Sequence, residues 1–185
     1  MIPEFLRRVV DEVVLLARES EFVDQNSGVS ARAAITAYEN VLSNVERRAV
    51  LHPGSTRRAR VCDLMAMIPS LTGKIELAYE GEQEGAMTVS RTLIGKAIQR
   101  VFLEHFPNPQ ARSASQRVRG REDADESHDV LDSEYRPIQE FFRHGGRIEV
   151  SDTQSDDAYA AALRAIPGLE DLVRRHMAPA DQDTP

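Results

Sequence analysis

The residue with the most suggestive chemical setting is Arg32, in the segment VDQNSGVSAR at positions 23–32. A polar, turn-prone stretch over residues 20–28, with Ser27 or Ser30 as the capping residue, leads into a predicted helix and places Arg32 in its first turn, on the polar face. A guanidinium beside the electropositive end of a helix suits a phosphate group that another part of a protein supplies. The alternative is an ordinary exposed or ion-paired arginine, although a cation in a first turn opposes the helix dipole.

The sequence has no phosphate-binding loop of the G-x-x-x-x-G-K-[ST] type. The pairs Gly73-Lys74 and Gly95-Lys96 are followed by Ile75 and Ala97, and the earlier glycine positions hold Ile68 and Ser90. The run Val9-Val10-Asp11-Glu12 imitates the acidic end of a Walker B strand, but it lies within a helical pattern. We therefore expect this chain alone neither to bind ATP tightly nor to hydrolyse it, and we assign it no catalytic residue.

The other chemically active side chains form no recognisable site. Glu76, Glu80, Glu82 and Glu84 are crowded together but lack the spacing of a cation-binding loop, and the five histidines have no Cys or His neighbour at zinc spacing. Cys62 lies on or beside an apolar helix face, which favours a buried thiol over a nucleophile. The arginines at 57, 58 and 60 are typical of a solvated basic turn. We therefore predict no metal site.

Composition narrows the class of protein. The 185 residues carry 30 acidic and 23 basic side chains, a formal net charge of -7, which disfavours a nucleic-acid binder. Hydrophobic residues make up 41%, enough for a packed core, and the single cysteine cannot form an internal disulfide. The sequence contains no long apolar run, so we expect no membrane span and a cytoplasmic location.

Hydrophobic periodicity predicts a mainly α protein. A helix is expected over 3–18, a second from about 30 to 50, a short third over 60–68 that Pro69 interrupts, and the longest over 83–106, ended by Pro107 and Pro109. Residues 74–82 fit either a short strand or an extended connection. The predicted apolar stripe of the second helix consists of Ala31, Ala34, Ile35, Tyr38, Val41, Leu42, Val45 and Ala49, and the third is expected to bury Val61, Leu64, Met65 and Ile68.

The predicted domain organisation is a helical bundle over 1–106, a disordered linker over 107–133, a small C-terminal helical subdomain over 134–178 and a disordered tail over 179–185. The linker has almost nothing to bury. In the subdomain we expect helices over 135–143 and 156–165, a short strand over 147–150, and a last helix that ends near His176.

The stretch LLARESEFVDQNSGVSARAAITAYENVLSNVERRAV resembles the helical lid of AAA+ ATPases related to magnesium chelatase subunit I. The segments LTGKIELAYEGEQEG, RTLIGKAIQRVFLEHF and SDTQSDDAYAAALRAIPGLEDLV are similar to an uncharacterised bacterial branch of that family. The resemblance therefore covers most of the chain outside the linker and implies an AAA+ lid-like bundle.

In that family the SGVSAR segment carries the sensor-2 arginine, so the resemblance implies that Arg32 contacts the γ-phosphate of ATP. It also implies a homo-oligomeric ring and a partner with a von Willebrand A domain. The family's phosphate loop, Walker B acid, sensor 1 and arginine finger belong to an α/β ATPase core domain, which would bind most of the ATP and Mg²⁺ and would precede residue 1. We therefore expect the chain to be either the C-terminal part of a longer ATPase or a lid that has lost its ATPase core. The ATPase would either insert magnesium into a porphyrin or remodel a partner protein.

Two alternative functions predict different behaviour. A free-standing helical interaction module with no nucleotide role would leave Arg32 as an ordinary surface residue. An independent metal-binding protein that uses Glu76 to Glu84 would be stabilised against heating by magnesium or calcium.

Overall fold

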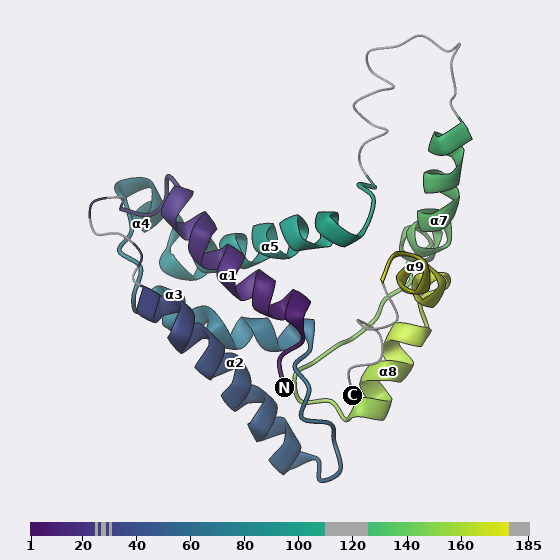
Figure 1. The fold of residues 1–185 in the computed structure, drawn as a ribbon, viewed down its shortest axis with the longest axis horizontal. Coiled ribbons are helices and arrows are strands. Elements are labelled where there is room, and N and C mark those ends of the chain that lie inside the picture. The colour runs from purple at the N-terminus through teal and green to yellow at the C-terminus, as the bar shows by residue number, and fades with distance from the viewer. Residues whose placement is uncertain (25, 27–28, 30, 110–125, 178–185) are drawn as a thin grey trace. The chain divides into compact units, whose positions relative to one another are not determined.

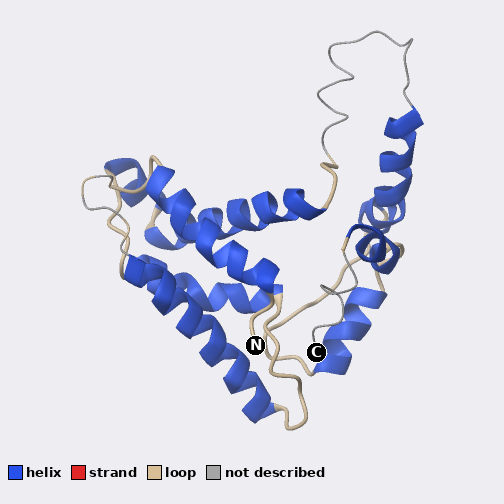
Figure 2. Ribbon diagram, in the orientation of Figure 1, coloured by secondary structure: helices blue, strands red, loops and turns tan. Residues whose placement is uncertain are grey.

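The computed structural model describes residues 1–24, 26, 29, 31–109 and 126–177. These residues are mainly helical, and they contain no β-strand but one isolated antiparallel bridge, between Val23 and Leu77 (Figures 1 and 2). The elements are α1 (Glu4–Glu19), α2 (Ala31–Leu51), the 3-10 helix η1 (Val61–Met67), α3 (Ile68–Thr72), α4 (Tyr79–Glu84), α5 (Ala86–His105), α7 (Glu126–Arg143), α8 (Asp156–Arg164) and α9 (Leu169–His176). The predicted capping residues Ser27 and Ser30 lie outside the described part.

The chain forms two compact units. The first consists of residues 1–102 together with 151–155, and the second contains the other described residues from 103 onward. The division between the units falls after Phe102, whereas the predicted bundle extends to residue 106, and the short segment 151–155 groups with the first unit. The predicted tail, residues 179–185, lies outside the described residues.

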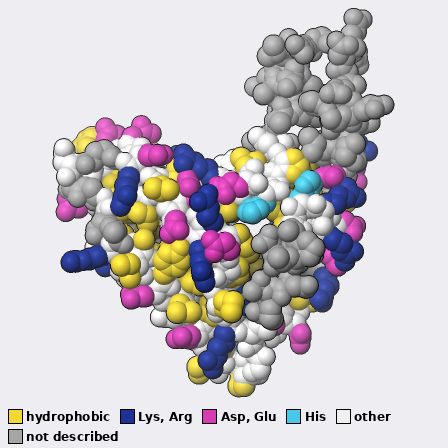
Figure 3. Space-filling model, viewed as in Figure 1, with side chains coloured by type: hydrophobic (Ala, Val, Ile, Leu, Met, Phe, Trp, Pro, Cys, Tyr) yellow, Lys and Arg dark blue, Asp and Glu magenta, His cyan; other side chains and the backbone are white. Residues whose placement is uncertain are grey.

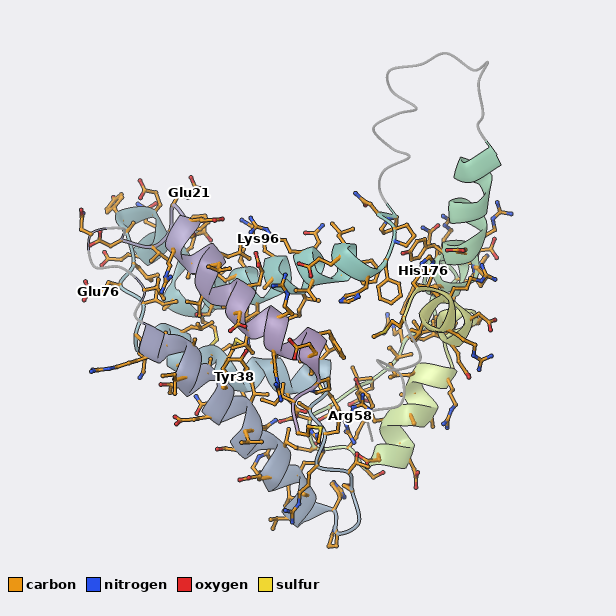
Figure 4. The ribbon with its side chains drawn as sticks, in the orientation of Figure 1. Glu21, Tyr38, Arg58, Glu76, Lys96 and His176 are labelled. Carbon is orange, nitrogen blue, oxygen red and sulfur yellow. The ribbon has the colours of Figure 1, made fainter. Side chains whose placement is uncertain are left out.

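The first unit is built around a single apolar core to which α1, α2, η1, α3 and α5 contribute. Helix α1 buries Leu6, Val9, Val10 and Val13, as its periodicity predicts, so Val10-Asp11-Glu12 belongs to a helix and not to a Walker B strand. Tyr38 of α2 points toward α1 (Figure 4), and its hydroxyl lies 2.9 Å from the carbonyl oxygen of Arg7. Burial and a hydrogen bond to Asp11 raise the pKa of Tyr38 above its usual value. The tyrosine therefore ties α2 to α1 in its neutral form.

Helix α2 corrects the predicted apolar stripe. Its buried face is centred on Ala33, Ala37, Val41, Val45 and Arg48, whereas two members of the predicted stripe, Ile35 and Leu42, are 58% and 40% exposed. The helix is rotated because small alanines allow close packing and because Arg48 is paired inside the protein, which a hydrophobic pattern does not register. Arg32, which we predicted on the polar face, is exposed.

The third predicted helix is two elements. Residues 61–67 form η1, in which side chains three residues apart lie on the same side, so Leu64 and Met67 are buried together while Met65 is 44% exposed. Val61 shares that spacing but stands at the first position of η1, where it is 42% exposed. Pro69 is the second residue of α3 and does not end a helix, because the backbone N–H groups of a first turn have no partner within the helix and proline lacks that group. Residues 74–82 are not a strand: they make the isolated bridge and then enter α4.

The longest predicted helix, over 83–106, corresponds to α5. Its inner face buries Val89, Leu93, Ile94, Ala97 and Val101. The expected linker over 107–133 differs from the structure at its end, because α7 begins at Glu126. Residues 110–125, the centre of that linker, lie outside the described residues.

The second unit pairs α9 with α7 and α8. It buries Tyr135, Ile166 and Leu172, and the Tyr135 hydroxyl donates to the carbonyl oxygen of Pro107 at 2.8 Å. The predicted strand over 147–150 is not formed: these residues have no regular secondary structure. The three predicted helices of this region are present as α7, α8 and α9.

Candidate functional site

Arg32 is the second residue of α2, and its side chain is exposed. The first turn of α2 carries no acidic residue, so its electropositive end is not neutralised from within the helix. The structure therefore places the predicted candidate on the surface, at the end of a helix where an anion is favoured.

Lys74 approaches the same turn from a distant part of the sequence. Its Nζ donates to Oγ1 of Thr36 at 2.8 Å, and the Thr36 hydroxyl donates to the carbonyl oxygen of Arg32, also at 2.8 Å. The exposed lysine follows the turn after α3, and its neighbour Ile75 is anchored in the core. Lys74 is therefore linked through Thr36 to the backbone of Arg32. We call Arg32, Thr36 and Lys74 the α2 basic corner.

Arg18 contacts the chain just ahead of α2. Nε and Nη2 of Arg18, at the end of α1, lie 3.3 and 3.2 Å from the carbonyl oxygen of Val29 and donate to it. Val29 is itself buried. The start of α2 is therefore fixed against α1 by a backbone contact, which gives Arg32 a defined position for contact with a ligand.

The chemistry open to the α2 basic corner is anion binding. A guanidinium, an ammonium and a hydroxyl can hold and neutralise phosphate oxygens. They supply neither a carboxylate base nor an activated nucleophile. The corner can stabilise charge on a phosphoryl group but needs groups from elsewhere to break a bond.

The outward face of α2 continues from Arg32 along the helix. Ile35, Glu39, Leu42 and Glu46 follow at alternating three- and four-residue spacing, and all four are exposed. This side of α2 therefore presents Ile35 and Leu42 to solvent between charged residues.

Sequence reasoning missed the most strongly buried charged residues. Arg48 and Asp63 are both 0% exposed, and Nη1 of Arg48 lies 2.5 Å from Oδ1 of Asp63. Asn44 adds a hydrogen bond to the same carboxylate oxygen at 2.8 Å. No spacing rule links residues of α2 and η1 across an irregular connection, so the pair had no signal in the sequence.

The cysteine and the possible metal-binding groups were also considered in the sequence. Cys62 is half-buried, and burial raises the pKa of its thiol, which disfavours the reactive thiolate. Within the described residues no group of three or more His, Cys, Asp or Glu side chains is placed to hold a metal ion. In Figure 3, acidic and basic side chains are interspersed over the visible face and do not gather into one basic patch.

Comparison with known proteins adds no assignment: no family model, curated protein or solved structure matches this chain. Across the described ranges, no helix has both the length and the apolar character needed to cross a bilayer.

Proposed function

We propose that this chain is the lid region of a magnesium chelatase subunit I-like AAA+ ATPase, in which Arg32 senses the γ-phosphate of bound ATP. The observation that carries the proposal is the exposure of Arg32 at the start of α2, with Lys74 on the same corner. The sequence resemblance suggests this role for Arg32, and its exposed position supports the proposal.

A γ-phosphate sensor needs a cation that reaches outward from a rigid element. Arg32 meets this requirement because α2 is packed along its buried face and its approach is held by Arg18. Lys74 would supply a second positive charge to the same phosphate oxygens, and charge of this kind stabilises the transition state of phosphoryl transfer.

The ATPase core domain would supply the remaining contacts. Arg32, Thr36 and Lys74 fit a phosphate group, whereas the described residues offer no carboxylate cluster for Mg²⁺, so the proposal assigns the metal and most of the nucleotide to the core. The exposed Ile35 and Leu42, on the same side of α2 as Arg32, would contact that core. The position of the lid relative to the core would then depend on whether ATP or ADP is bound.

The family's wider assembly belongs to the same proposal. It includes a homo-oligomeric ring, a partner with a von Willebrand A domain, and either porphyrin metallation or protein remodelling as the outcome. We favour remodelling, because the resemblance is to the uncharacterised bacterial branch and not to the pigment-pathway enzymes.

A nucleotide comparison tests the sensing role. A magnesium chelatase-type ATPase core joined ahead of residue 1 is titrated with ATP under non-hydrolysing conditions and with ADP. Arg32→Ala is expected to weaken ATP binding by about tenfold while leaving ADP binding unchanged, because only ATP has the γ-phosphate. An equal effect on both nucleotides, or no effect on either, would contradict the proposal.

A second candidate function is a helical interaction module with no nucleotide role, which the exposed Ile35 and Leu42 favour. In that case Arg32→Ala leaves both nucleotides unaffected, whereas Leu42→Asp abolishes binding of the partner protein.

A further inference from the structure

The segment Ser151–Ser155 returns to the first unit although the residues on both sides of it belong to the second. It is a compact turn, in which the amide of Ser151 donates to Oε1 of Gln154 at 2.9 Å and the amide of Thr153 donates to Oγ of Ser151 at 3.1 Å. Hydrogen bonds within the segment therefore help to define its shape.

Three side chains of the first unit contact three successive carbonyl oxygens of this turn. Arg48 Nη1 donates to the carbonyl of Asp152 at 3.2 Å, and Arg60 Nη1 donates to that of Gln154 at 2.8 Å. Between them, Nε2 of His52 lies 2.5 Å from the carbonyl of Thr153. A contact to every carbonyl in a row is the pattern by which a protein recognises a peptide backbone.

The side chain of Asp152 receives separate contacts. Its Oδ2 accepts from Nη2 of Arg47 at 2.8 Å and from Nδ2 of Asn44 at 3.0 Å. A charge-assisted pair and an amide contact to one carboxylate select aspartate over a neutral residue.

The receptor side is held in place by its own contacts. Arg48 is fully buried, where it pairs with Asp63 and donates to the carbonyl of Arg58 at 2.7 Å. The amide of Arg60 donates to Oδ2 of Asp63 at 2.7 Å. Asp63 therefore positions two of the three groups that contact the turn carbonyls, so little ordering is required when the turn binds.

We infer that Asn44, Arg47, Arg48, His52 and Arg60 form a peptide-binding site for a short aspartate-bearing turn, and that residues 151–155 are its built-in ligand. The site holds residues 151–155 within the first unit without a covalent bond. A peptide with the same sequence would compete for it. This inference does not rest on the proposed nucleotide role.

A peptide rescue tests the inference in the full chain. Asp152→Lys replaces the recognised carboxylate with a cation beside Arg47 and should release the turn, which nuclear magnetic resonance detects as shifts in the Asn44 side-chain amide and His52 ring signals. A synthetic peptide of residues 147–158 should return both signals to their wild-type positions. The same peptide with lysine in place of Asp152 should not, and Asp157→Lys, five residues away on α8, should leave the signals of the full chain unchanged.

Each other outcome overturns the inference. Unchanged signals in Asp152→Lys would show that the carboxylate does not hold the turn. A released turn with no response to the wild-type peptide would show that no separable site exists, and equal responses to both peptides would show that the site does not recognise aspartate. Circular dichroism of both lysine variants verifies that the helices are intact.

Discussion

Arg48 and Asp63 form an ion pair from which water is fully excluded, with Nη1 and Oδ1 2.5 Å apart and both side chains 0% exposed. The pair joins the last turn of α2, which contains Arg48, to the first turn of η1, which contains Asp63. A buried pair of this kind stabilises little compared with apolar residues of similar size, but either charge alone is costly.

Removing one partner is therefore expected to destabilise the first unit strongly. Asp63→Ala leaves the Arg48 guanidinium buried without its carboxylate and should lower the free energy of unfolding by about 3–5 kcal/mol. Urea unfolding followed by circular dichroism measures the change. Replacing both residues, Arg48→Met with Asp63→Leu, should restore most of the loss, and a double variant as unstable as Asp63→Ala would show that the charge is not the cause.

Two glycines make a matched pair for a packing test. A Cβ on Gly81 would overlap the carbonyl oxygen of Phe22, next to the Val23–Leu77 bridge, whereas a Cβ on Gly95 of α5 meets open space. Gly81→Ala should destabilise the protein by about 1–3 kcal/mol through this overlap, while Gly95→Ala should stabilise it by about 0.5–1 kcal/mol through its helix preference. Thermal unfolding of the two variants checks the opposite signs, and a shift in the same direction for both would contradict this packing.

Acidification should weaken the second unit through Glu134. A hydrogen bond from His176, together with one from Arg175, lowers the pKa of Glu134 below its usual value, against the opposing effect of burial. A carboxyl whose pKa is lowered by folding stabilises the folded state above its unfolded pKa, and that contribution is lost as the pH falls through the lowered value.

Glu134→Gln should accordingly make stability less dependent on pH in the acidic range. Melting temperatures of the full chain, measured at a series of pH values, give the slope for each variant. The control is Glu170→Gln on α9. The Glu170 carboxylate is exposed and forms a surface ion pair with Arg174, so this variant should keep the wild-type slope. Identical slopes for wild type and Glu134→Gln would refute this assignment.

Periodicity predicted the elements better than their packing. It was right for α1 and α5 because each of these helices buries a continuous apolar face. For α2 it was right for Val41 and Val45, which are buried, but wrong for Ile35 and Leu42, which are exposed. Ala33, Ala37 and Arg48, which the pattern did not include, complete the buried face. Pro69 was taken as an interruption because its sequence context does not distinguish a helix that ends from one that begins.

The sequence predicted one residue of the candidate site, Arg32, but not the contacts made by residues distant in the sequence. Capping and dipole arguments located Arg32 on the polar face of its helix, where the structure has it. Lys74 reaches Thr36 across 38 positions, and Asp152 reaches Arg47 across 105, so both contacts depend on the tertiary fold. No local pattern in a single sequence encodes such distances.

The central claim is that Arg32 acts on nucleotide, and ATP turnover by a reunited protein tests it most directly. A magnesium chelatase-type ATPase core joined ahead of residue 1 should hydrolyse ATP, and Arg32→Ala should lower its turnover by at least about tenfold because charge stabilisation of the γ-phosphoryl group is lost. Arg91→Ala, an exposed arginine on α5, is the matched control and should retain full turnover. Wild-type turnover in Arg32→Ala, or an equal loss in both variants, would contradict the account.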